Sequence, residues 1–227
     1  MKFDELTILT VTFNNNLLTG AMLKSFNKQV GKLPEVIIVD NGDTIQADDN
    51  LKLAFNVIDN FNHKILEDEK QASRNHASAI DYALKNCIKT KWCLLVDNDI
   101  LFKPEIKDFI ENIDTNKCDC AGQIGWDCTP PTRIFPYLCL INVDKFKNDK
   151  LNYFDRNRIT NHCTKGLPYT FNRKYDRYDT GYSFYEDIKK SWRIYNFNLN
   201  TVCIHLKSGM LANKNIEQWI YLNRNLL

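Results

Sequence analysis

The stretch WCLLVDNDILF (residues 92–102) decides the fold, because it sets two aspartates between two apolar runs. The apolar run 93–96 predicts a strand that is buried on both faces, as the strands of a parallel sheet are. Burying a carboxylate costs free energy unless the group has a partner. Asp97 and Asp99 therefore stand at the end of a buried strand for a purpose other than packing.

The segments around this stretch alternate strands with amphipathic helices. Two further buried strands are predicted at 6–13 (LTILTVTF) and 35–44 (EVIIVDNGDT), the second ended by a turn-forming Asn-Gly pair. Apolar residues at three- and four-residue spacing predict three helices, the last opened by Pro104. Their stripes are Leu18, Ala21, Met22 and Phe26; Ile80, Ala83, Leu84 and Cys87; and Ile106, Phe109, Ile110 and Ile113. The alternation predicts an α/β fold with a mostly parallel, Rossmann-like sheet flanked by helices and joined by right-handed crossovers.

The second half of the sequence is less regular and predicts a mixed arrangement. We expect a strand at 133–146, a long loop at 157–181, a helix at 182–195 and a last strand at 201–206. The closing stretch IEQWIYLNRNLL (216–227) is an amphipathic helix, for which packing on the core is the default and a neighbour or a membrane surface is the alternative. Since no linker or repeat interrupts the chain, residues 1–227 are predicted to form one domain.

Composition restricts the class of protein. The 227 residues are 44% apolar, which is enough for a full core. Thirty basic and 28 acidic residues give a net charge of +2, so no nucleic-acid partner is expected. The amino-terminal stretch lacks a signal peptide and no window reaches the roughly 18 apolar residues of a transmembrane segment. We expect a cytoplasmic protein, with peripheral membrane contact left open.

Eight cysteines raise the question of disulfides or zinc. Several lie in apolar runs, where a free cysteine behaves as a small hydrophobe, so we expect them to be reduced. The group Cys118, Cys120 and Cys128 lacks the C-x2-C spacing of zinc sites, and no histidine follows at the usual distance. Buried or loop thiols are the expectation, and a zinc site is the alternative.

Polar residues follow each predicted strand of the parallel sheet. Thr12 and Asn14 come at the end of the first strand, Asp40 ends the second, and Asp97 ends the strand at 92–97. Ligands of open α/β sheets bind outside the carboxyl ends of the strands, so these side chains are expected to converge on one edge. The alternative is that they are ordinary turn and cap residues.

The sequence Asp97-Asn98-Asp99 has the spacing of a cation site. Alternate residues of extended backbone point the same way, so the two carboxylates can share one hard cation or its waters. Magnesium and manganese are typically held by one or two carboxylates together with substrate phosphates. The pair therefore predicts Mn2+ or Mg2+ together with a ligand that carries a diphosphate.

Several motifs in order resemble one enzyme family. LTVTFNN, IIVDNGDT, ASRNHASAIDYAL and WCLLVDNDI are similar to the nucleotide-sugar half of GT-A fold glycosyltransferases, particularly the bacterial family-2-like group with rhamnosyltransferase-type members. RIFPYLCLINV, YDTGYSFYEDI and CIHLKSG resemble the acceptor-side half of small bacterial or viral glycan-building members. The resemblance covers most of 6–208 and implies a nucleotide-sugar-binding half at 1–103 and an acceptor-side half at 104–227.

The resemblance implies a set of donor-binding residues. Thr12 and Asn14 stand where the first-strand loop of the family meets the nucleotide, and Asp40 stands where an acidic residue binds the base or ribose. Arg74 and Asn75 match the ARN of the helix that closes over the nucleotide, although Ser73 precedes them here and the usual nearby glycines are missing. The resemblance also assigns Asp97 and Asn98 to the donor, with Asp97 reaching the ribose or a metal-bound water, and Asp99 to the metal that bridges the phosphates.

YEDI supplies the acceptor chemistry that the resemblance implies. An inverting enzyme needs a carboxylate that takes the proton of the acceptor hydroxyl and a cation that neutralises the departing diphosphate. Glu186 and Asp187 lie about 100 degrees apart on a helix, so only one is expected to face the site. We predict Asp187 as the base and Glu186 as an acceptor-binding residue, or the two in exchanged roles. The alternative is that both acids stabilise the first turns of the helix.

Three further positions complete the predicted site. The resemblance places His205 as a third metal ligand, whereas a histidine beside apolar neighbours is also an ordinary core residue. The loop 169–185 combines basic and aromatic residues that suit an acceptor platform or a lid, with Asp179 on sugar hydroxyls and Arg133 near the sugar. A solvated loop is the alternative. His63, His76 and His162 receive no role.

The sequence thus predicts a metal-dependent, inverting glycosyltransferase that moves a hexose or deoxyhexose from a nucleoside-diphosphate sugar, with uridine as the favoured base, to a glycan-type acceptor. One alternative is a nucleotidyltransferase, which would usually have a glycine-rich phosphate loop near the amino terminus, and none is present. Another is a non-catalytic module that binds nucleotide sugars or glycans, against which the Glu186-Asp187 pair argues.

Overall fold

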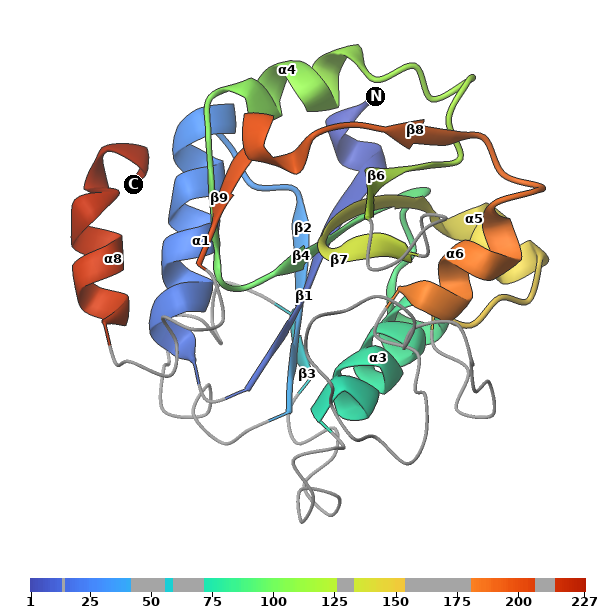
Figure 1. Ribbon diagram of the computed structural model, residues 1–227, viewed down its shortest axis with the longest axis horizontal. Helices are drawn as coiled ribbons and strands as arrows, with labels where there is room; N and C mark the ends of the chain where they lie inside the picture. Colours follow the sequence, from blue (N-terminus) through green and yellow to red (C-terminus); the bar gives the residue numbers. More distant parts are fainter. Residues whose placement is uncertain (14, 42–55, 59–71, 126–132, 154–180, 207–214) are drawn as a thin grey trace, which may run out of the picture.

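The computed structural model describes residues 1–13, 15–41, 56–58, 72–125, 133–153, 181–206 and 215–227. A seven-stranded sheet of order β3-β2-β1-β4-β7-β6-β8 forms its centre, and a separate ribbon pairs β5 with β9 (Figure 1). Helices α1 and α3 flank the sheet in this view, with α4 along its upper rim. The predicted α/β class with a mostly parallel sheet flanked by helices is confirmed.

The parallel half of the sheet follows the prediction closely. Its strands are β1 (Leu6–Thr12), β2 (Glu35–Asp40), β3 (Asn56–Ile58) and β4 (Trp92–Asp97), and β1 pairs in parallel with both β2 and β4. The helices are α1 (Asn16–Val30), α3 (Ala72–Tyr82), which continues as a π-helical turn η4 (Ala83–Cys87), and α4 (Glu105–Asn112). Parallel pairing places the carboxyl ends of β1, β2 and β4 on one edge of the sheet.

The other half of the sheet corrects two predicted boundaries. The strand predicted at 133–146 ends earlier, as β7 (Arg133–Asn142), because the Asn142 side chain accepts a hydrogen bond from the Lys145 N–H and starts α5 (Val143–Asn148). The helix predicted at 182–195 ends at Ile188, as α6 (Tyr182–Ile188), and β8 (Ile194–Asn196) follows. Pairing with β6 (Cys120–Gly125), a strand that the apolar pattern did not reveal, outweighs the helical pattern of this segment.

The last predicted strand lies in the two-stranded ribbon and not in the central sheet. Only Cys203–His205 form a strand, β9, which follows a short 3-10 turn η5 (Leu199–Thr201). It pairs antiparallel with β5 (Ile100–Phe102), so that His205 lies opposite Ile100 and Cys203 opposite Phe102. The ribbon therefore joins the segment directly after Asp99 to the segment that carries His205.

The closing helix packs on the body of the protein, as expected. Trp219 of α8 (Ile216–Leu222) lies in a buried cluster with Leu18 and Ala21 of α1, and Leu226 of the turn η6 (Arg224–Leu226) joins it. The side chain of Gln29 donates to the Leu226 carbonyl at 3.1 Å. Across the described residues, no helix has both the length and the apolar character needed to span a bilayer.

The cysteines that the structure describes are free thiols. Five of these six are buried and Cys87 is half-buried. Burial raises the pKa of the Cys118 thiol to about 11 and that of the Cys203 thiol to about 12, which keeps them protonated at neutral pH. The prediction of reduced thiols is confirmed for these residues, while Cys128 and Cys163 lie outside the described part of the chain.

A buried carboxylate fixes the segment that turns from α6 into β8. Both Asp119 oxygens accept hydrogen bonds from the Arg193 guanidinium, at 3.0 and 2.5 Å, and the Arg193 N–H donates at 2.9 Å. The Asp119 side chain is only 4% exposed. The guanidinium and N–H of Arg193 hold the pKa of the Asp119 carboxyl well below its usual range.

We expect Asp119→Asn to lower the free energy of unfolding by about 2 kcal/mol at neutral pH, the scale of hydrogen bonds to a charged group. Because the folded pKa is depressed, this stabilisation is present above the unfolded pKa of about 3.9 and is lost as the pH falls toward the folded value. Urea denaturation across pH should show the difference from wild type shrinking below about pH 4. Asp144→Asn, at an exposed position, is the control, and equal losses for both variants would refute the assignment.

Candidate active site

The carboxyl ends of three parallel strands meet at one edge of the sheet, as the sequence predicts. Thr12 of β1 pairs with Asp40 of β2, and Val11 pairs with Asp97 of β4. The Asn41 N–H donates to the Thr12 carbonyl at 2.9 Å, which ties the ends of β1 and β2 together. This edge therefore collects Thr12, Asp40 and Asp97 within adjacent strands.

Asp97, Asp99 and His205 form a cluster of potential metal ligands. One ligand atom from each lies within 4.8 Å of the others. A divalent ion of magnesium size holds ligands at about 2.1 Å, so opposite ligands stand about 4.2 Å apart, and this cluster is close to that spacing. Asp97 Oδ1 and Asp99 Oδ1 are buried, and each faces a histidine Nε2, that of His76 at 3.4 Å and that of His205 at 3.2 Å. Two carboxylate oxygens and an imidazole that converge in this way fit a cation site.

The β5–β9 ribbon holds His205 against Asp99. The His205 Nε2 lies 3.2 Å from Asp99 Oδ1, and the Leu206 N–H donates to the Asp99 carbonyl at 2.8 Å. The ring of Tyr137 stacks on the imidazole at 4.5 Å with 13° between the planes. Burial lowers the pKa of His205, but the adjacent Asp99 and the nearby Asp97 outweigh burial, so the pKa is raised. His205 is thus held in place from two sides, by Asp99 and by the Tyr137 ring.

Asn98 fixes the turn between the two aspartates. Its side-chain amide donates to Thr12 Oγ1 at 2.9 Å and to Thr19 Oγ1 at 3.3 Å. Thr19 also donates to the Asn15 carbonyl at the start of α1. The structure therefore brings Thr12 and Asn98 together as predicted, and it adds Thr19, which the apolar pattern hides because a buried threonine on a helix resembles a core position.

His76, which receives no role from the sequence, lies beside the site. Its Nε2 is 3.4 Å from Asp97 Oδ1, and the two side chains are each 24% exposed. Helix α3 brings the imidazole there from the residue directly after the Arg74-Asn75 pair. In the sequence, the feature that distinguishes His76 from the other histidines is that it directly follows the Arg74-Asn75 pair.

The predicted acid pair lies on α6, a short helix that packs through Phe184 and Ile188 into the core. Glu186 is engaged by Lys189, whose ammonium donates to Oε1 at 2.6 Å. Asp187, the next residue, is half-buried. The Glu186 carboxylate thus already serves an ion pair on its own helix.

Gly181, at the amino terminus of α6, has a left-handed backbone with φ +84°, and a Cβ there would lie 2.4 Å from the Ile134 carbonyl oxygen. Gly31 has the same conformation, φ +88°, with nothing within 4 Å of its would-be Cβ. We expect Gly31→Ala to cost about 1 kcal/mol of unfolding free energy and Gly181→Ala at least about 2 kcal/mol. Urea denaturation of both variants measures the difference in unfolding free energy. Equal costs would show that β7 moves away from the start of α6 without strain.

The remaining predicted residues are placed as follows. Asp40 is fully buried, and Arg133 is half-buried at the start of β7 with its guanidinium 5.0 Å from the Phe135 ring centre. Arg74 and Asn75 lie in the first turns of α3, but their side chains fall outside the described part. Asn14, Asp179 and the loop 169–180 also lie outside it.

Three solved structures show how the fold of this chain compares with known folds. The mannosyltransferase PcManGT from Pyrobaculum calidifontis, in complex with GDP-Man and Mn2+, aligns with a TM-score of 0.54 and 13% identity over 90% of this chain and 58% of that one. GlyE of Streptococcus pneumoniae TIGR4 aligns with a TM-score of 0.49 and 12% identity over 85% and 45%. S. aureus TarS (residues 1–349) in complex with UDP-GlcNAc aligns with 0.43 and 16% over 66% and 48%. The chain spans between 45% and 58% of the length of these three proteins. The alignment with PcManGT shows that its fold is GT-A.

Comparison of sequences identifies the family. None of the curated proteins matches the chain. The profile of Glycosyl transferase family 2 matches residues 7–176, about three quarters of the sequence. The match includes β1, β2 and β4, the three strands whose ends form the site edge, together with Asp97 and Asp99. The chain therefore belongs to glycosyl transferase family 2 and has the GT-A fold.

Proposed function

We propose that the chain is a metal-dependent, inverting glycosyltransferase that moves a hexose or deoxyhexose from a nucleoside-diphosphate sugar, with uridine as the favoured base, to a glycan-type acceptor. The observation that carries the proposal is the cluster of Asp97, Asp99 and His205 at the carboxyl edge of the parallel sheet. Ligands of such sheets bind at this edge. Membership of family 2 supports the reaction class.

The ligand atoms of the cluster suit Mn2+ or Mg2+. Asp99, Asp97 and His205 would hold the ion, and a bound ion would supply positive charge to neutralise the departing diphosphate. Two carboxylates favour a hard divalent cation, and the imidazole makes manganese the better fit of the two. PcManGT, whose structure contains Mn2+ and GDP-Man, has the same fold.

The protein groups around the ion would bind and orient the donor. Thr12, Asn14, Asp40 and Asn98 are proposed to contact the nucleotide, and Arg74 and Asn75 are proposed to close over it. The amide of Asn98 keeps the turn in place through its bond to Thr12, so the two carboxylates are oriented before a ligand binds. Arg133 and Asp179 are proposed to reach the sugar from the acceptor half, with 1–227 acting as one domain.

Asp187 is proposed to take the proton of the acceptor hydroxyl as it attacks the anomeric carbon. In an inverting transfer one carboxylate suffices, because the attacking oxygen replaces the diphosphate in a single displacement. Glu186 is the weaker candidate because its carboxylate is bound by Lys189 at 2.6 Å, and it is proposed to bind the acceptor.

A thermal-shift screen tests this function. A ligand that binds only the native state must raise the melting temperature, so nucleoside diphosphates and their sugars are compared with and without Mn2+. We expect one base to give a shift that requires the ion, followed by release of that nucleoside diphosphate when acceptor glycans are added. A shift without any transfer to a broad acceptor panel would favour a binding module, and release of pyrophosphate from a nucleoside triphosphate would favour a nucleotidyltransferase.

A further inference from the structure

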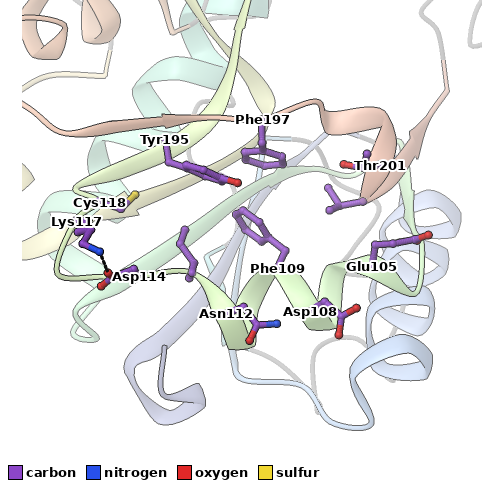
Figure 2. A pocket seen from close by; sticks show the side chains of 12 residues that line it. Glu105, Asp108, Phe109, Asn112, Asp114, Lys117, Cys118, Tyr195, Phe197 and Thr201 are labelled. Atoms are coloured by element: carbon purple, nitrogen blue, oxygen red, sulfur yellow. Dashed lines mark ion pairs between the residues drawn. The ribbon is translucent and has the colours of Figure 1, made fainter.

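A second cleft lies away from the proposed active site. It has a volume of about 560 Å³ and lies between α4 and the segment that runs from β8 through η5 (Figure 2). The Met1 nitrogen donates to the Ile110 carbonyl at 3.3 Å, which places α4 beside the start of the chain leading into β1. Thr12 ends β1 at the opposite edge, about 20 Å further along the strand. The cleft shares no lining residue with the Asp97, Asp99 and His205 cluster.

Aromatic rings form the interior of this cleft. Figure 2 shows Phe109 of α4 pointing toward Phe197, with Tyr195 beside them. The ring centres of Phe109 and Phe197 are 4.5 Å apart, and the rings of Tyr195 and Phe197 are stacked, with centres 6.1 Å apart and 18° between their planes. Tyr195 is 53% exposed, so a ligand in the cleft can contact its side chain. The face of such a ring carries partial negative charge.

Carboxylates add negative charge to the lining of the cleft. Glu105, Asp108 and Asp114 line the cleft, and Lys117 is the cation of the described lining. The Lys117 ammonium is already paired with Asp114 at 3.2 Å. Glu105 and Asp108 are exposed, and neither forms an ion pair with a described lining residue. An exposed aromatic ring and unpaired carboxylates both attract a cation, and both repel the phosphates of a nucleotide sugar.

We propose that this cleft binds a small organic cation, an ammonium group on an apolar body. The volume lies within the roughly 300–1,000 Å³ of small-molecule sites, and the apolar interior with a few polar groups at its rim is the usual character of such sites. The apolar body packs on Tyr195, Phe197 and Phe109, and the ammonium lies at the other end of the cleft, toward Glu105 and Asp108 (Figure 2). The site is independent of the proposed transfer reaction and needs no divalent ion.

Chemical-shift titration of the isotope-labelled chain tests the proposal with three probes of similar apolar body: benzyltrimethylammonium, benzyl alcohol and benzenesulfonate. We expect saturable shifts at Phe109, Tyr195 and Phe197 for the ammonium, with at least tenfold weaker binding of the other two. The shifts should persist in EDTA. Equal binding of the three probes, or no saturable shift with the ammonium, would overturn the proposal.

Variants separate charge selection from general surface attraction. The double variant Glu105→Gln with Asp108→Asn should weaken the ammonium at least tenfold, and Tyr195→Ala should do the same. The matched control, Glu111→Gln with Asp144→Asn, removes two exposed acids outside the cleft and should bind as wild type does. Because Glu105 and Asp108 are exposed, the spectrum of the double variant should remain that of the folded chain. Unchanged affinity in that folded variant would contradict the proposal.

Discussion

Asp99→Asn is expected to abolish the manganese-dependent binding of a nucleoside diphosphate and to lower transfer about 100-fold or more. The substitution keeps the shape of the side chain and removes one of the two carboxylates in the cluster. Asp99 is the proposed ligand that His205 also contacts, at 3.2 Å, so the substitution alters both its own place in the cluster and that of His205. Calorimetric titration of the nucleoside diphosphate with and without Mn2+ measures the first effect, and a transfer assay measures the second.

Folding of this variant is not expected to suffer. Removing one charge relieves the repulsion between Asp97 and Asp99, and the backbone bond from the Leu206 N–H to the Asp99 carbonyl is retained. Asp144→Asn, the same change at an exposed position of α5, should leave metal-dependent binding and transfer unchanged. If Asp99→Asn retains the metal-dependent affinity of wild type, Asp99 is not a metal ligand.

Asp187→Asn should leave donor binding intact while transfer falls about 100-fold, the usual scale of general-base loss. The asparagine cannot take the proton of the acceptor hydroxyl, whereas Asp97, Asp99 and His205 are unaltered. Glu186→Gln should have a smaller effect on transfer, because its carboxylate is already bound by Lys189. Donor affinity is measured by calorimetry and turnover under saturating donor. A fully active Asp187→Asn would move the base to another residue, with Glu186 as the next candidate.

The parallel half of the fold could be predicted because each of its elements carries its own signal. Continuous apolar runs specify β1, β2 and β4, and the four predicted apolar positions of α1 are all buried. The mixed half could not be predicted as well. Whether 189–195 continues a helix or joins a sheet depends on Asp119, which binds the Arg193 side chain and backbone from 74 residues away. Long-range contacts of this kind leave no local pattern.

The candidate site shows the same division. Asp97 and Asp99 stand out because carboxylates interrupt an apolar run, and the structure places His205 beside them through a ribbon that the sequence predicts only as a single strand. His76 and Thr19 escaped notice because their neighbours in space, Asp97 and Asn98, belong to other segments. A side chain whose role depends on the crossing of two elements cannot be recognised from either element alone.

The central claim is that Asp97, Asp99 and His205 bind a nucleoside diphosphate through a divalent ion. Its most direct test is calorimetric titration of the wild-type chain with the nucleoside diphosphate that gives the largest thermal shift, in Mn2+ and again in EDTA. The proposal predicts saturable binding in Mn2+ that weakens at least tenfold in EDTA, a difference of about 1.4 kcal/mol or more in binding free energy. Equal affinity under the two conditions would contradict it.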